Sequence, residues 1–311
     1  MAATRTPLEG LTVLERGWLS SNNVLIHAAE GAAGAVLVDS GHLNHAGQTV
    51  ALVRHALSAG RLDRIVNTHL HSDHCGGNAA LQRAFGVPVI IPPGSAEAVR
   101  AWDASGLTYK ATGQRCERFE VAATLAPGDE FTAGGRRWEV LAAPGHDPDS
   151  VMLFDAANGV LVSADALWEH GFGVVFPEID GEPGFDDVGA VLDLIRRLPV
   201  QLVIPGHGAP FTDVAAALAR AGSRLSGFQT DPARHARHAA KVLIKYHMME
   251  ERSQPLDELL RWAGATPMLG ALWARHGVLE SESPIAWAER FVRELVAGGA
   301  LAQHDGLVSD R

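Results

Sequence analysis

The sequence feature that most constrains this chain is a cluster of metal-binding side chains at residues 69–74. The cluster has the pattern His-x-His-x-Asp-His and directly follows residues 64–68, which are predicted to form a short buried strand. Neutral imidazole and carboxylate groups are the natural ligands of zinc and similar divalent metals. A single histidine is more often a packing or capping residue. Three imidazoles and a carboxylate within six residues therefore predict a metal site in a loop at a strand end.

Three further candidate ligands follow apolar segments downstream. His146 lies in Ala-Pro-Gly-His-Asp, Asp165 in Val-Ser-Ala-Asp and His207 in Pro-Gly-His-Gly. Each preceding segment is predicted to be a buried strand, so each ligand is expected at a strand end, where loops can converge without disrupting the core. Together with the first cluster, the set provides five histidines and two aspartates, which is enough for two metal ions.

The chain divides into two parts by its pattern of predicted elements. Strands and helices alternate through residues 1–210, with predicted hairpins at 131–140 and 154–162. Beyond residue 210 the pattern that predicts strands nearly vanishes. The charge also changes there: residues 211–311 contain 12 Lys and Arg and 12 Asp and Glu, so the whole net charge of −10 falls on residues 1–210. We expect a metal-binding domain at 1–210 and a helical domain at 211–311 that packs over it.

The helical part ends in a pattern that resembles a winged-helix module. Helices are predicted at 214–225, 232–250, 256–263 and 284–299, followed by a hairpin around Asp305–Gly306. The second helix carries a basic stripe whose members are Arg234, Arg237, His238, Lys241 and Lys245. The stripe is either a solvated face or a holder for an anionic substrate, and Arg237 and Lys241 are the candidates for the second role.

The composition is that of an ordinary globular chain of 311 residues, with 47% hydrophobic and 20% charged residues. The sequence has no run of 18 apolar residues that predicts a membrane span, and residues 1–10 lack the pattern of a signal peptide. Two cysteines, Cys75 and Cys116, are too few for a disulfide framework, so a reducing cytoplasm is expected. The net charge of −10 argues against nucleic-acid binding by the chain as a whole.

The ordered motifs resemble those of the metallo-β-lactamase superfamily of binuclear metallohydrolases. Thr68 precedes the first motif and Cys75-Gly76-Gly77 follows it, and all seven ligand positions are filled in order over residues 10–210. Ser150 is a departure, because many relatives carry a second histidine there. The resemblance implies an α+β fold, namely a four-layer αββα metallo-β-lactamase sandwich, here with a mostly helical and winged-helix-like C-terminal extension.

The same resemblance implies a role for each candidate ligand. The first metal is expected to be held by His69, His71 and His146, and the second by Asp73, His74 and His207. Asp165 is expected to bridge the two metals, and Asp39 to lie buried beneath the site and support the ligands. Zinc is the expected metal, with iron and manganese as alternatives.

Two such cations would share a hydroxide whose pKa they lower towards neutrality, and Asp73 would orient its proton as the catalytic residue. Asp165 favours the branch of glyoxalase-II-like thioesterases, lactonases and ribonuclease-like members. The intact His71 argues against the oxygen-reducing diiron relatives. The sequence therefore predicts a hydrolase that cleaves a thioester, ester or lactone of a small molecule. The alternatives are a phosphodiesterase or ribonuclease, a mononuclear iron dioxygenase and a non-catalytic regulatory relative.

The segment after Asp165 is expected to approach the substrate. Trp168 and Phe172 are candidates for an apolar wall, and His170 for a polar contact, although aromatic residues at such positions also serve as core residues. The expected partner is a small and anionic substrate, with no membrane association. The sequence leaves the oligomeric state open.

Overall fold

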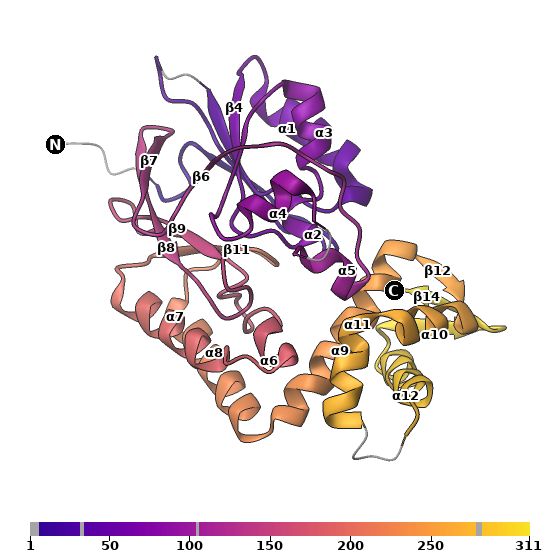
Figure 1. Cartoon of the computed structure of the whole chain (residues 1–311). Coiled ribbons are helices and arrows are strands. Elements are labelled where there is room, and N and C mark those ends of the chain that lie inside the picture. Colours follow the sequence, from indigo (N-terminus) through magenta and orange to yellow (C-terminus); the bar gives the residue numbers. More distant parts are fainter. Residues whose placement is uncertain (1–5, 32–33, 104–105, 278–281) are drawn as a thin grey trace.

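Two β-sheets pack face to face between layers of helices in the computed structural model, which describes residues 6–31, 34–103, 106–277 and 282–311 (Figure 1). The first sheet contains, in spatial order, β1 (Leu11–Leu14), β2 (Asn23–Ile26), β3 (Ala35–Val38), β4 (Leu62–Val66), β5 (Val89–Ile91) and β6 (Val121–Thr124). The second contains β11 (Leu202–Pro205), β10 (Val160–Ala164), β9 (Val151–Asp155), β8 (Arg136–Ala142) and β7 (Glu130–Ala133). The αββα sandwich expected from the sequence is confirmed.

Strand direction explains where the helices lie. Strands β3 to β6 are parallel, so helices must carry the chain back between them. These connections contain η1 (Leu43–His45), α1 (Ala46–Leu57), α2 (Ser72–Cys75), α3 (Asn78–Phe85), α4 (Ala96–Ala101) and α5 (Thr108–Thr112). In the second sheet β7 to β10 are antiparallel, which confirms both predicted hairpins, and only β11 is parallel to its neighbour. The connection to β11 contains α6 (Phe176–Asp180) and α7 (Phe185–Arg197).

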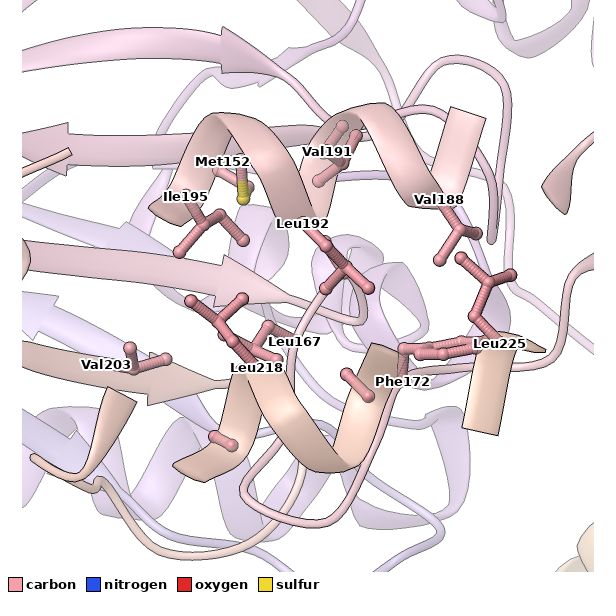
Figure 2. Close-up of a cluster of buried hydrophobic side chains, with 14 of the residues drawn as sticks. Met152, Leu167, Phe172, Val188, Val191, Leu192, Ile195, Val203, Leu218 and Leu225 are labelled. Carbon is pink, nitrogen blue, oxygen red and sulfur yellow. The ribbon is translucent and has the colours of Figure 1, made fainter. Parts of the chain in front are cut away.

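Apolar side chains fill three separate layers of the sandwich. Between the sheets, Trp138 is fully buried among valines and isoleucines of both sheets. Outside the first sheet, helices α1, α3 and α4 cover a second cluster. Outside the second sheet, α7 and α8 (Val214–Thr230) meet over the strands. Figure 2 shows Leu192 of α7 and Leu218 of α8 among the side chains of this cluster, together with Val203 of β11.

The helical part of the chain contributes to two different cores. Helix α8 shares the core of the second sheet, whereas the following elements form a core of their own around Trp287 and Phe291. They are α9 (Pro232–Glu251), β12 (Ser253–Pro255), α10 (Leu256–Ala265), α11 (Pro267–Leu272), η2 (Trp273–Gly277), α12 (Pro284–Ala297), β13 (Leu301–His304) and β14 (Leu307–Asp310). The last two strands pair as the predicted hairpin, and β12 completes a small sheet with them. The division at residue 210 stays a prediction.

Helix α9 is fixed against the metal-ligand side of the sandwich by buried polar contacts. His42 Nε2 lies 2.8 Å from Glu250 Oε1, and both side chains are almost completely buried. The amide of Asn44 donates to the carbonyl of Glu250 at 2.9 Å, and the Tyr246 hydroxyl lies 2.8 Å from Ser72 Oγ. The C-terminal helices therefore cover the edge of the sandwich that carries the ligand motifs. In the described residues, no helix combines the length and the apolar character that crossing a membrane requires.

Candidate metal centre

All seven predicted ligands lie close together at one edge of the sandwich. They come from the ends of four strands: His69 and His71 follow β4, Asp73 and His74 lie in α2, His146 follows β8, Asp165 follows β10 and His207 follows β11. Each of these residues is 8% exposed or less. Their ligand atoms form two groups: one contains the nitrogens of His69, His71 and His146, and the other contains Asp73, His74, Asp165 and His207.

The first group is three imidazole nitrogens that face one another. His71 Nδ1 lies 2.7 Å from His146 Nε2 and 3.1 Å from His69 Nε2. His146 Nδ1 donates to the carbonyl of Val174 at 2.6 Å, so its Nε2 carries a lone pair directed at the centre of the group. Burial also lowers the pKa of His71 and of His146 to about 4, which keeps both rings neutral. Converging neutral imidazoles fit a divalent metal ion.

The second group brings carboxylates against imidazole nitrogens. His207 Nε2 lies 3.0 Å from Asp73 Oδ2, and His74 Nε2 lies 3.3 Å from Asp165 Oδ1. Burial disfavours charge on His74, yet the carboxylates of Asp165, Asp39 and Asp73 raise its pKa well above its ordinary value. The surroundings of this ring thus favour a positive charge, and a bound cation supplies one. Carboxylate and imidazole donors again fit a divalent metal.

Asp165 lies between the two groups. Its Oδ2 is 3.3 Å from His146 Nε2 in the first group, while its Oδ1 faces His74 and is 3.9 Å from His207 Nε2 in the second. Gly206 allows this approach, because a Cβ atom at that position would lie 2.1 Å from Asp165 Oδ1. One carboxylate therefore has an oxygen directed at each group, which is the arrangement that a bridging ligand requires.

Asp39 supports the ligands from below. Its Oδ2 accepts a hydrogen bond from His74 Nδ1 at 2.8 Å, and the backbone N–H and hydroxyl of Thr68 donate to its carboxylate at 2.9 and 2.8 Å. Asp39 has a φ of 58°, an uncommon conformation for a residue with a side chain, and these bonds hold it there. Because Nδ1 of His74 donates to Asp39, Nε2 remains free to bind a metal. Cys75, next to His74, is completely buried and packs in the core outside the first sheet.

A cavity of about 590 Å³ opens from the two groups towards α8 and α9. Of the predicted substrate contacts, Trp168, His170 and Lys241 line it. Trp168 Nε1 also donates to Asp165 Oδ1 at 3.2 Å. Several lining residues that the sequence did not predict come from distant segments: Trp18, Gln114, Phe176, Arg224, Val242, Leu243, Tyr246, Met249 and Leu295. No local motif marks them, and the four on α9 reach the site only because that helix docks there.

Two predicted substrate contacts lie elsewhere. Phe172 is 1% exposed and belongs to the core outside the second sheet, where Figure 2 shows it beside Leu225. It turns away from the cavity because the apolar faces of α7 and α8 bury it. Arg237 points to the start of its own helix, where it pairs with Asp231 at 3.3 Å. Neither side chain lines the cavity in this structure.

The basic stripe of α9 is largely neutralised within the protein. Lys241 lies 2.5 Å from Glu294 of α12, and Lys245 pairs with Asp310 of β14 and donates to the carbonyl of Ala300. The stripe therefore serves mainly to hold α9 against the C-terminal elements.

Comparisons with known proteins agree with this fold. The family model of the metallo-beta-lactamase superfamily matches residues 16–207, and the chain belongs to this superfamily. A metallo-beta-lactamase family protein from Thermus thermophilus has the same fold over 98% of this chain and 99% of its own, with a TM-score of 0.57 and 20% identity. Another solved protein, in a di-iron-bound form, is 26% identical with a TM-score of 0.50, over 68% of this chain and 98% of its own.

The curated relatives are hydrolases. A hydroxyacylglutathione hydrolase from Idiomarina loihiensis is 30% identical over 138 residues, which is 44% of each chain. An acyl-coenzyme A thioesterase from Homo sapiens is 27% identical over 63% of this chain and 76% of its own. The chain spans about half the length of the first hydroxyacylglutathione hydrolases that it matches.

Proposed function

We propose that this protein is a binuclear metallohydrolase that cleaves a thioester of a small molecule. The observation that carries the proposal is the position of Asp165, whose two carboxylate oxygens face different groups of ligands. The names of the relatives add support, since both a hydroxyacylglutathione hydrolase and an acyl-coenzyme A thioesterase act on thioesters. Zinc is the proposed metal, with iron as the principal alternative because one similar structure is in a di-iron-bound form. The two free cysteines support a cytoplasmic location.

The proposed reaction divides the work among the residues of the chain. Divalent metals held by the two groups of ligands would supply a hydroxide nucleophile at neutral pH and would polarise the thioester carbonyl. His74 and His207 lower the pKa of Asp73 to about 2 against the effect of its burial, so Asp73 is an ionised carboxylate that accepts a hydrogen bond from the nucleophile and orients its proton. Trp168 holds Asp165 through its indole N–H and, together with Trp18, covers the ring of His207. These aromatic side chains exclude water from one side of the centre.

A thioester suits this cavity because its leaving group does not need a strong proton donor. A thiol has a pKa of about 8.5, so its thiolate leaves without a strong general acid, whereas an alkoxide benefits from one. Tyr246 is the tyrosine in the cavity lining, and its hydroxyl is bonded to Ser72. Burial, aided by the charge of Asp73, raises its pKa well above the usual value, which makes it a poor proton donor. Cleavage of a nucleic acid is the weaker candidate, because Lys241 and Lys245 are paired with carboxylates.

The proposal is tested by hydrolysis assays of the full chain reconstituted with zinc, iron or manganese. The substrates are an acyl-glutathione, an acyl-coenzyme A, a homoserine lactone and a short RNA. We expect metal-dependent thiol release from at least one thioester, with two metal equivalents per chain by elemental analysis. Cleavage of the lactone or the RNA with both thioesters intact would reject thioester hydrolysis. Full activity with a single equivalent would reject the binuclear centre.

A further inference from the structure

The cavity contains a cationic side chain whose charge the protein does not balance. Arg224 of α8 lines the cavity, and no acidic side chain in the described parts of the chain pairs with it. The two lysines of the lining differ, since Lys241 pairs with Glu294 and Lys245 with Asp310. Burial, together with the nearby charge of Arg234, lowers the pKa of Arg224. A partly buried charge without a counter-ion is unfavourable unless a ligand supplies one.

The guanidinium group of Arg224 is held in one place by its neighbours. It lies 5.4 Å from the ring centroids of both Phe172 and Phe228, and its NH2 donates to His238 Nε2 at 2.6 Å. The loop after Asp165 approaches it closely at Gly171, which has a φ of 132°; a Cβ atom there would lie 2.7 Å from Arg224 NH1. An arginine fixed in this way loses little side-chain entropy on binding a ligand.

His238 adds a second donor beside Arg224. Because an arginine only donates hydrogen bonds, His238 Nε2 is the acceptor and the neutral ring carries its hydrogen on Nδ1. Burial and the charge of Arg224 lower the pKa of His238 to about 3, so the ring adds no charge. Apart from the metal ligands, the described lining residues include one carboxylate, that of Glu169. Its side chain is exposed and lies 3.8 Å from His170. Among the described lining residues, Arg224 therefore provides the cationic charge that no carboxylate pairs with, and Arg234 is a further cation nearby but outside the lining.

We propose that Arg224 and His238 bind a single carboxylate on the substrate, at the wall of the cavity that α8 and α9 form. This inference rests on the proposed thioester hydrolysis and names its substrate class as thioesters that bear one carboxylate. A guanidinium binds a carboxylate through two parallel hydrogen bonds, and one positive charge matches a monoanion better than a phosphate dianion. Val174, Phe176 and Val242 give the cavity an apolar wall that covers the aliphatic part of such a molecule.

The test uses thioethers, which are not hydrolysed and have no free thiol to bind a metal. Binding of ω-(methylthio)alkanoates with four, six and eight carbon atoms is measured by titration calorimetry on the full chain, beside the matching amides and phosphonates. We expect one acid to bind at least tenfold more tightly than its amide. Arg224→Gln should remove that preference and leave amide binding unchanged, and Arg224→Lys should restore part of it. Arg234→Gln is the control, since this arginine lies outside the cavity lining and the substitution removes the same charge.

Three results would overturn the carboxylate subsite. They are an equal loss of acid and amide binding in Arg224→Gln, no preference for any acid in the unaltered chain, and tighter binding of the phosphonates than of the acids. The kinetic test compares a thioester of 3-mercaptopropionate with that of 3-mercaptopropionamide. Arg224→Gln should raise KM for the thioester of 3-mercaptopropionate about tenfold, with little change in kcat. If neither thioester is hydrolysed but acid binding still depends on Arg224, thioester hydrolysis fails and the subsite stands.

Discussion

The cavity has two walls that are built in different ways. The metal-ligand wall consists of buried side chains that other groups hold from behind, as Asp39 holds His74 and the carbonyl of Val174 holds His146. The opposite wall consists of α8, which packs in the core of the second sheet, and α9, whose position depends on long-range contacts such as the pair of His42 and Glu250. Substitutions in the first wall should therefore change the chemistry, whereas substitutions in the second should change docking and binding.

The largest effect is expected from the charge of Asp165. Asp165→Asn keeps the size and one oxygen but removes the negative charge between the two groups of ligands. We expect turnover to fall by about 10²-fold or more and metal content to drop, while the fold is retained. Steady-state kinetics, elemental analysis and circular dichroism measure the three quantities.

Asp149→Asn is the matched control for this substitution. Asp149 lies nearby in the chain, where the Ser95 hydroxyl donates to it at 3.3 Å, and it belongs to neither group of ligands. It should behave as the unaltered protein does. Full activity and full metal content in both variants would show that Asp165 does not bridge two metals.

A smaller effect is expected from the contact that holds the second wall in place. Glu250→Ala leaves His42 Nε2 buried without its acceptor, so the free energy of unfolding should fall by about 2 kcal/mol. Glu251→Ala, one residue further on, removes only an exposed ion pair with Arg115 and should change the free energy of unfolding by less than about 0.5 kcal/mol. Urea unfolding monitored by tryptophan fluorescence gives both values. Equal values for the two variants would contradict the docking role of Glu250.

The smallest effect is expected where the two walls meet. Tyr246→Phe removes the hydroxyl that contacts Ser72, but Ser72 keeps its bond to Gln114 at 2.9 Å. We expect kcat/KM to fall about threefold, which corresponds to less than about 1 kcal/mol. Tyr109→Phe, whose hydroxyl donates to the carbonyl of Leu70 in the core, should lower stability without changing KM. If KM changes in Tyr109→Phe and not in Tyr246→Phe, Tyr246 does not belong to the binding wall.

Local sequence patterns predicted most of the sandwich correctly. The hairpins at β7–β8 and β9–β10 and helices such as α9 and α12 lie where alternation and helical spacing indicated. The pattern was less informative for short elements such as β12, whose three residues become a strand only by pairing with β14. Such a strand has no core-facing alternation of its own, so the pairing partner decides it.

The sequence by itself determined the seven ligand-type residues and their order, because each follows a strand whose apolar pattern is readable in a few consecutive residues. Only the tertiary structure decided which way other side chains face. Phe172 lies seven residues after Asp165 and is in the core, whereas Arg224 and Tyr246 reach the cavity from helices far along the chain. The pair of His42 and Glu250 joins residues 208 positions apart. The direction of a side chain is set by what packs against it, and no local pattern contains that information.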